Sequence, residues 1–225
     1  MRGTQRARRA LLVAYAALPL AAAATPRSVP SAPPTPGGLT LEVTRDGDAF
    51  VVTAHADLLA DARTAWDTIT DLERLPQFVP NITRVRVLSR QPQASGELLA
   101  VAFDGSFRLF FLSFPTHVWL DVEHVPYTDV LSRLRPPPPG ETSPSSLKRF
   151  SGRYTLTTVG AGRGGATRVR FDYNAEFALA QPLPPVLGTL FGTAAVRAML
   201  REQFAALVAE IERRARARQG LQPSR

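Results

Sequence analysis

One stretch of the chain, residues 65–81, decides the fold, and it reads AWDTITDLERLPQFVPN. Just before it, Asp61 is a typical helix N-cap, because a short side-chain oxygen accepts hydrogen bonds from the first free N–H groups of a helix. Within it, Thr70–Glu73 resembles a capping box, and Pro76 and Pro80 keep a second helix short. Apolar residues follow Asp61 at the i, i+3, i+4, i+7 spacing of one helix face: Ala62, Ala65, Trp66 and Ile69. The stretch therefore predicts two short helices in succession.

The sequence on both sides of this stretch has the period of two that is typical of strands. It opens with strand from Leu39, and alternation returns over residues 82–177. Between residues 168 and 176, charged and amide side chains alternate with Val169, Phe171 and Tyr173. One-sided strands joined by short turns predict an antiparallel sheet with one face in water.

The last long segment of the chain has the pattern of an amphipathic helix. Prolines at residues 136–144 predict a long loop, and those at 182–185 introduce a helix from about Pro185 to Arg218. Its apolar stripe must be buried, and the dry face of the sheet is the surface available. The sequence thus predicts an α+β fold: a curved antiparallel β-sheet wrapped around a long C-terminal helix, with two short helices after the first strand.

The N-terminus has the pattern of an export signal. Arginines precede the apolar run Ala10–Leu18, and Ala22–Ala24 matches a cleavage site for small residues. An uncleaved N-terminal anchor is the alternative. We expect a signal peptide over 1–24, a Pro-rich linker over 25–38, one domain over 39–218 and a disordered tail over 219–225. This organisation predicts an exported protein of the periplasm or cell envelope.

The charge distribution argues against nucleic acid as a partner. The formal net charge is +8, but four arginines precede residue 25 and five follow residue 212, so residues 25–212 carry about −1 in total. A nucleic-acid-binding protein needs its basic surface on the folded body. The C-terminal arginines, Arg213 to Arg218, suit the dipole of a helix C-terminus. The alternative is peripheral contact with anionic lipid.

The sequence shows no catalytic or metal-binding motif. The chain has no cysteine, which excludes disulfides, zinc–thiolate sites and thiol nucleophiles. Its histidines, His55, His117 and His124, lack the i, i+4 spacing of paired metal ligands on a helix. His117 shares a strand face with Trp119, Asp121 and Glu123; that set is interpreted as facing water, with a metal or acid–base cluster as the alternative. We therefore expect no catalytic residues, no metal and no cofactor.

Residues 65–81 resemble the signature of the polyketide cyclase/dehydrase and START-like (SRPBCC) superfamily, and most closely its coenzyme-Q-binding START-domain branch. A second match is Phe150–Tyr154, followed by the strand over 167–173 and the closing helix. Together these matches span nearly all of residues 39–215. The resemblance implies a helix-grip fold, with a deep apolar cavity between the sheet and the C-terminal helix. It also implies a hydrophobic small-molecule ligand such as a lipid, quinone or polyketide.

The closing helix carries small residues at positions where a solid core would need large side chains. They are Gly188, Gly192, Ala194 and Ala195. Opposite aromatic side chains, they would leave a space lined by carbon; the alternative is that they let the helix and sheet approach closely. Trp66 is interpreted as a core residue. Residues 107–114 are apolar on both faces, which indicates either a doubly covered strand or an exposed patch. The residues expected to line the cavity are Phe78, Val101, Phe103, Phe107, Phe111, Tyr154, Phe171, Tyr173, Phe191, Ala195 and Met199.

Two functions fit this cavity. The first is non-catalytic binding or transport of a hydrophobic small molecule. The second is a cyclase/dehydrase-type enzyme that acts on a polyketide-like chain in the same space. An enzyme needs inward acids, bases and donors, and Tyr154 and Tyr173 are the only obvious polar tips, so binding is favoured. Docking onto another macromolecule is a third alternative, and it conflicts with export.

Overall fold

The structure is a computed structural model that describes residues 38–109, 112–161, 167–181 and 185–220. The predicted signal peptide, nearly all of the Pro-rich linker and residues 221–225 of the tail lie outside these ranges. We therefore describe the domain that follows the linker.

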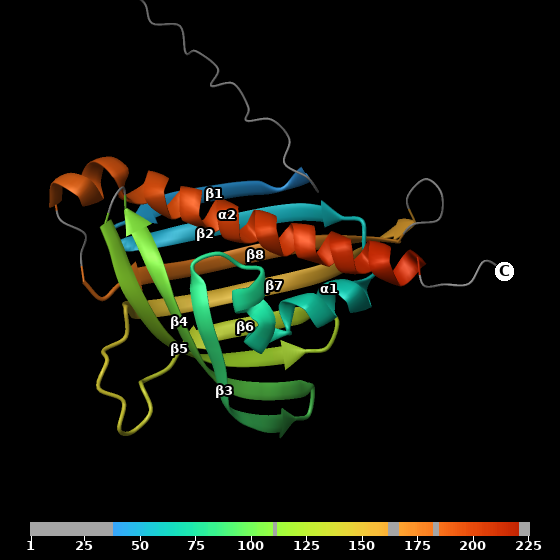
Figure 1. Ribbon diagram of the computed structural model, residues 1–225, viewed down its shortest axis with the longest axis horizontal. Coiled ribbons are helices and arrows are strands. Elements are labelled where there is room, and N and C mark those ends of the chain that lie inside the picture. The colour runs from blue at the N-terminus through green and yellow to red at the C-terminus, as the bar shows by residue number, and fades with distance from the viewer. Residues whose placement is uncertain (1–37, 110–111, 162–166, 182–184, 221–225) are drawn as a thin grey trace, which may run out of the picture. The chain divides into compact units, whose positions relative to one another are not determined.

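An eight-stranded antiparallel sheet forms the body of this domain, and helix α2 lies across one face of it (Figure 1). The spatial order is β1-β2-β8-β7-β6-β5-β4-β3, and each strand pairs in antiparallel fashion with its neighbours. Residues 135–146 form the predicted loop between β6 and β7. The predicted fold class is confirmed. The strands are β1 (Thr40–Asp46), β2 (Ala49–Leu58), β3 (Ile82–Gln93), β4 (Gly96–Leu109), β5 (Leu112–Val125), β6 (Asp129–Leu134), β7 (Leu147–Ala161) and β8 (Thr167–Leu179).

The opening of the domain differs from the prediction in one respect. Two strands, β1 and β2, precede the short helices instead of one. They form a hairpin, with Asp46 paired to Ala49 and the turn between them at Gly47. Gly47 has a φ of 58°, in the left-handed region that glycine adopts at little cost. The single run of alternation in the sequence therefore folds back on itself.

The two predicted short helices form, but only the first is an α-helix. Helix α1 (Ala62–Ile69) begins as expected, and the Asp61 carboxylate accepts a hydrogen bond from Thr64 N at 2.7 Å. The second, η2 (Leu72–Gln77), is a 3-10 helix, and no side chain caps it. The Thr70 hydroxyl instead donates to the Trp66 carbonyl at 2.8 Å, because Thr70 ends α1. The predicted capping box is therefore absent, and this hydroxyl helps to terminate the first helix.

Helix α2 (Pro185–Gly220) begins at the predicted proline and runs two residues past the predicted end. Its buried residues Val196, Phe204 and Ile211 join the core cluster on the inner face of the sheet. Two hydrogen bonds attach its middle to the rest of the domain. Arg197 donates to the Val43 carbonyl of β1 at 2.9 Å, and Gln203 donates to the Pro80 carbonyl at 3.2 Å.

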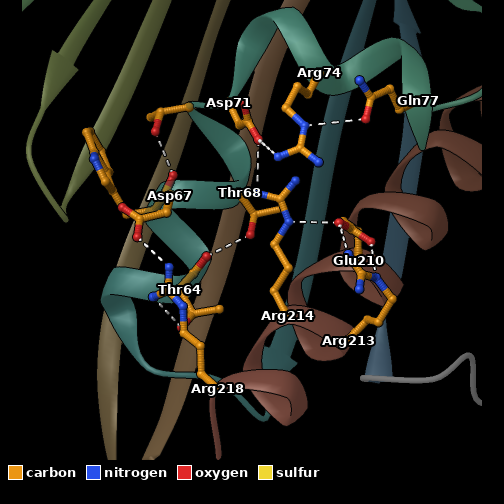
Figure 2. Close-up of polar contacts among 12 residues, drawn as sticks. Thr64, Asp67, Thr68, Asp71, Arg74, Gln77, Glu210, Arg213, Arg214 and Arg218 are labelled. Atoms are coloured by element: carbon orange, nitrogen blue, oxygen red, sulfur yellow. Dashed lines mark hydrogen bonds and ion pairs between the residues drawn. The ribbon is translucent and has the colours of Figure 1, made fainter. Parts of the chain in front are cut away.

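The C-terminal end of α2 is attached to α1 and η2 by arginine–carboxylate contacts (Figure 2). Arg214 donates to Glu210 at 2.7 Å and to Asp71 at 3.1 Å. Arg218 donates to Asp67 at 2.8 Å. We call these five residues the C-terminal ion-pair cluster.

The same region shows how the arginines of the predicted basic tail, Arg213 to Arg218, are paired. Arg213 also binds Glu210, and the hydrogen bonds from Arg213 and Arg214 lower the pKa of the Glu210 carboxyl to about 2. Arg216 lies 3.8 Å from Glu212. All four tail arginines within the described part of the chain therefore have carboxylate partners, which leaves less unpaired charge for anionic lipid.

A close approach between β4 and the start of β3 requires a glycine at position 105. The Asn81 carbonyl, from a residue with a φ of 65°, accepts a hydrogen bond from Ser106 N at 2.9 Å. A Cβ atom on Gly105 would collide with that carbonyl and would lie 3.2 Å from the Thr116 hydroxyl. Because the obstacle is backbone, it cannot rotate away.

Gly105→Ala tests this close approach. We expect it to lower the free energy of unfolding by about 1–3 kcal/mol, the usual cost of overpacking, as measured by the midpoint of denaturant unfolding. Gly220→Ala is the matched control, since nothing lies within 4 Å of an added Cβ there. An equal loss in the two variants would contradict the steric explanation.

Arg214→Ala tests the C-terminal ion-pair cluster. The Arg214 side chain is 17% exposed, and it also lies over the Phe78 ring at 5.4 Å, so its removal leaves two half-buried carboxylates without this partner. We expect a loss of about 1–3 kcal/mol in unfolding free energy. Arg216→Ala, at a 69% exposed side chain, should cost less than about 0.5 kcal/mol. Similar losses for both variants would show that the cluster does not anchor α2.

Candidate ligand cavity

A cavity with two lobes lies between the inner face of the sheet and α2. The more open lobe has a volume of about 270 Å³, and the more enclosed lobe has about 170 Å³. We call them the open lobe and the enclosed lobe. The wall between and around them is shared by residues of the sheet, the start of β3 and α2: Ile82, Phe103, Leu120, Phe150, Tyr154, Tyr173, Gln203 and Phe204.

Each lobe has its own lining beyond this shared wall. The open lobe extends along α2 toward its N-terminus, where Val196 and Met199 line it together with Val118 of β5. The enclosed lobe is closed by apolar side chains of the short helices and adjacent strands: Ile69, Leu72, Leu75, Val79, Val122 and Val130. Both lobes are thus lined mainly by carbon, as is typical of sites for hydrophobic molecules.

Phe204 of α2 fills the space between the helix and the middle of the sheet. Its ring centroid lies 5.0 Å from that of Tyr173, 6.1 Å from that of Phe171 and 6.4 Å from that of Tyr154. One and two turns toward the N-terminus, the helix presents the smaller side chains of Leu200 and Val196. The helix therefore meets the sheet at Phe204, and space is left on either side of that contact.

Gly152 on β7 gives room to two of the aromatic side chains. A Cβ atom there would lie 3.0 Å from the Phe150 ring and 3.3 Å from the Tyr173 hydroxyl. The missing side chain lets the Phe150 ring lie beside the strand and brings the Tyr173 hydroxyl over the backbone. This glycine belongs to the short motif 150–154 that the sequence singled out.

Two tyrosines place hydroxyl groups in the wall that the two lobes share, where Gln203 is the other polar side chain among the described residues. Tyr154 and Tyr173 are directly opposite each other in the β7–β8 register, and their ring centroids are 4.4 Å apart. Burial raises the pKa of Tyr154 to about 12. Burial, with a smaller effect of Tyr154, raises the pKa of Tyr173 well above its ordinary value. Both hydroxyls are therefore protonated and neutral near pH 7.

The structure places some of the predicted cavity residues in the wall. They come from β4, β7, β8 and α2, as the alternation of the strands and the helical stripe predicted. Those that line the open lobe are Phe103, Phe107, Tyr154, Tyr173 and Met199.

Other predicted residues lie elsewhere. Val101 and Phe171 are fully buried in the core beside the cavity, and Phe78 packs under the Arg214 guanidinium. Ala195 is half-buried on α2 and is not among the lining residues. Phe111 and the Phe191 side chain lie outside the described residues.

Sequence reasoning missed several lining residues. Phe150 is four residues before Tyr154 on the same strand, so its parity could have placed it on the inner face. Gln203 interrupts the apolar stripe four residues after Met199, and a lone amide at that spacing could have indicated a polar group in the cavity. Leu72 and Leu75 were assigned to a short helix, but nothing in the sequence indicated what that helix would cover.

Each histidine lies beside a carboxylate, and His55 lies beside two, Asp172 and, at 3.8 Å, Asp57. His55 lies 2.7 Å from Asp172, and His117 lies 2.9 Å from Asp104. His124 is only 4% exposed and lies 3.1 Å from Glu97, and burial lowers its pKa. No group of three histidine, aspartate or glutamate side chains lies close enough to hold a metal ion in the described part of the chain.

The side chains of His117, Trp119, Asp121 and Glu123 share one strand face, which the sequence predicted to face water. One of the four is buried instead. Trp119 is 2% exposed, although it was expected to face water with its polar neighbours. Its neighbour Asp121 forms an ion pair with Arg135 at 3.3 Å, and Arg135 N donates to the Trp119 carbonyl. The backbone hydrogen bond continues the pairing of β5 with the residue that follows β6.

The cavity and its framework can now be compared with known proteins. The family model for polyketide cyclase/dehydrase and lipid transport matches residues 58–204. The chain belongs to this family. A comparison with curated protein sequences finds no match. The matched range includes α1, all strands from β3 to β8 and α2 as far as Phe204.

Solved structures with the fold of this family resemble the domain. A START superfamily protein from Mycobacterium smegmatis has 15% identity and a TM-score of 0.50, covering 74% of this chain and 97% of its own. Human STARD10 has 9% identity and a TM-score of 0.53, and the match covers 81% of this chain and 77% of STARD10. The di-domain ARO/CYC StfQ from the steffimycin biosynthetic pathway has 14% identity and a TM-score of 0.51. The match covers 76% of this chain and 52% of StfQ. At these identities the likeness shows the START-like helix-grip fold alone.

One further observation concerns membranes. Within the described ranges, no helix combines the length and the apolar character needed to cross a bilayer.

Proposed function

We propose that this protein binds or transports a hydrophobic small molecule, without chemistry, in the two-lobed cavity. The observation that carries the proposal is the cavity itself, with lobes of about 270 and 170 Å³ and a wall made mainly of carbon. Together the lobes reach the lower part of the range for small-molecule sites, roughly 300–1,000 Å³. Membership in a family of cyclases, dehydrases and lipid-transport proteins is consistent with such a ligand.

The physical driving force is the removal of apolar surface from water. Each buried CH₂ group contributes about 0.8 kcal/mol, and association costs at least about 4 kcal/mol in lost freedom of motion. A ligand must therefore bury several carbons before it binds. Both lobes offer apolar walls for that purpose, so an acyl, prenyl or polycyclic group fits the proposal.

The chemistry of the wall supports binding over a cyclase or dehydrase reaction. Among the described lining residues there is no histidine, lysine, arginine or glutamate to move a proton. Asp104 is present, but its carboxylate pairs with His117 at 2.9 Å and lies 3.9 Å from Arg86. General acid–base catalysis requires a titrating group within hydrogen-bond reach of the reacting atoms. Hydroxyl groups of tyrosine, serine and threonine remain in the wall, and they suit recognition by hydrogen bonding.

Met199→Trp tests binding in the open lobe. The larger indole would displace part of the ligand, and losing about two buried CH₂ groups should weaken binding about 10-fold. The measurement is the Kd for an uncharged fluorescent analogue, a fatty-acyl ester or a prenyl chain, supported by native mass spectrometry of the purified protein for lipid that copurifies. Thermal unfolding verifies that the variant folds.

Ala198→Trp is the matched control for this variant. Ala198 is exposed on the same helix and does not line the cavity, so its replacement should leave the Kd unchanged. Equal Kd values for Met199→Trp and the unaltered protein would contradict binding in the open lobe. Turnover of a polyketide-like substrate would favour the enzyme.

We also propose that the protein is exported to the periplasm or cell envelope. The support is the sequence pattern of residues 1–24, a basic segment, an apolar run and a cleavage site for small residues. The intact mass of protein recovered from its own cells should match a chain that begins near residue 25. A chain that begins at Met1 and remains in the cytosol would refute export.

A further inference from the structure

We propose that the ligand is an uncharged molecule with a carbonyl oxygen, and that the hydroxyls of Tyr154 and Tyr173 donate hydrogen bonds to that oxygen. This inference rests on the proposed function, because it names the chemical class that the same cavity selects. In this proposal the two tyrosines determine which ligand is preferred. The apolar side chains of the wall supply the affinity for hydrophobic molecules in general.

The first observation is that both hydroxyls lack partners. Neither has a hydrogen bond to another described residue. Tyr173 is 8% exposed and Tyr154 is half-buried, and both line both lobes. Buried polar groups in proteins are almost always hydrogen-bonded, because leaving one without a partner is costly. Because neither hydroxyl is used by the described part of the protein and both side chains line the cavity, both are available to donate to a ligand.

The second observation is their geometry. Tyr154 and Tyr173 are opposite each other on neighbouring strands, so both side chains project from the same face of the sheet. Their ring centroids are 4.4 Å apart with an angle of 36° between the planes, and Phe204 packs against both rings. The two side chains are thus held side by side. Two neighbouring donors suit one oxygen with two lone pairs, which is the form of a carbonyl.

The third observation is the charge of the wall. No lysine or arginine is found among the residues described as lining the two lobes. A carboxylate would therefore lose its water without gaining a cation, which is strongly unfavourable in apolar surroundings. Burial raises the pKa of both phenols, so they stay protonated and able to donate. A ketone, ester or quinone oxygen fits these conditions, and a free fatty-acid anion does not.

Gln203, the nearby amide, is less available as a donor. Its Nε2 already donates to the Pro80 carbonyl at 3.2 Å, where it attaches α2 to the segment before β3. A ligand that took over this donor would have to break that attachment. The tyrosine hydroxyls require no such rearrangement.

The test uses three probes of nearly the same shape: acetylnaphthalene, ethylnaphthalene and naphthoate, each substituted at the same ring position. They present a ketone, a hydrocarbon and a carboxylate to the same cavity. We expect the full chain to bind the ketone about 5- to 30-fold more tightly than the hydrocarbon, from one or two net hydrogen bonds. The carboxylate should bind more weakly than the ketone. Isothermal titration calorimetry or displacement of a fluorescent probe gives the Kd values.

The decisive variant is the double substitution Tyr154→Phe with Tyr173→Phe, which keeps both rings and removes both hydroxyls. Its affinity for the ketone should fall to that for the hydrocarbon, while its affinity for the hydrocarbon stays unchanged. Tyr127→Phe is the matched control, since Tyr127 is exposed and lies outside the cavity, and it should keep the preference for the ketone. If the double variant does not fold, each single variant should lose part of the preference.

The outcomes separate this inference from the proposed function. Ketone and hydrocarbon bound equally by the unaltered protein, or a preference that survives in the double variant, would overturn the tyrosine assignment and leave hydrophobic binding intact. Naphthoate bound as tightly as the ketone would overturn the requirement for an uncharged ligand. Failure of all three probes and of the fluorescent lipid analogues to bind would overturn both proposals.

Discussion

The contact between Phe204 and the aromatic side chains of β7 and β8 determines how far α2 stands from the sheet. Its ring lies within 6.4 Å of the ring centroids of Tyr154, Phe171 and Tyr173. Aromatic pairs of this kind contribute about 0.5–1.5 kcal/mol each beyond the burial of their area. The contact holds the helix and at the same time keeps it from settling onto the strands. The two lobes exist because this contact is local, with smaller side chains or none beside it.

The same contact connects the architecture to ligand recognition. Two of the rings that support Phe204 belong to the tyrosines that present hydroxyls to the cavity. A group that serves both packing and recognition is held rigidly, so little freedom is lost when a ligand binds. Gly152 contributes by leaving room for the Tyr173 hydroxyl beside the strand. One small cluster of side chains thus supports both the packing of α2 and the proposed specificity.

The sequence was informative where the determining interactions are local. The Asp61 cap lies three residues from its partner Thr64, and the parity of Tyr154 and Tyr173 follows from alternation within single strands. It was uninformative where the interactions span the chain. The collision that makes Gly105 necessary involves Asn81, just before β3, and Asp71, one partner of Arg214, is 143 residues away. Hydrophobic periodicity and residue propensity describe neighbours in the sequence, so they do not predict such pairings. These pairings arise from the arrangement of the whole folded domain.

The low pKa of Glu210 has a consequence for the acid tolerance of the domain. Hydrogen bonds from Arg213 and Arg214 hold that pKa at about 2, below the ordinary value of 4.5. A carboxylate with a depressed pKa stabilises the folded state fully above its ordinary pKa, and this contribution is lost only as the pH falls toward the depressed value. The attachment at the end of α2 is therefore built to retain its charge in mildly acidic media, where an unassisted glutamate would begin to take up protons.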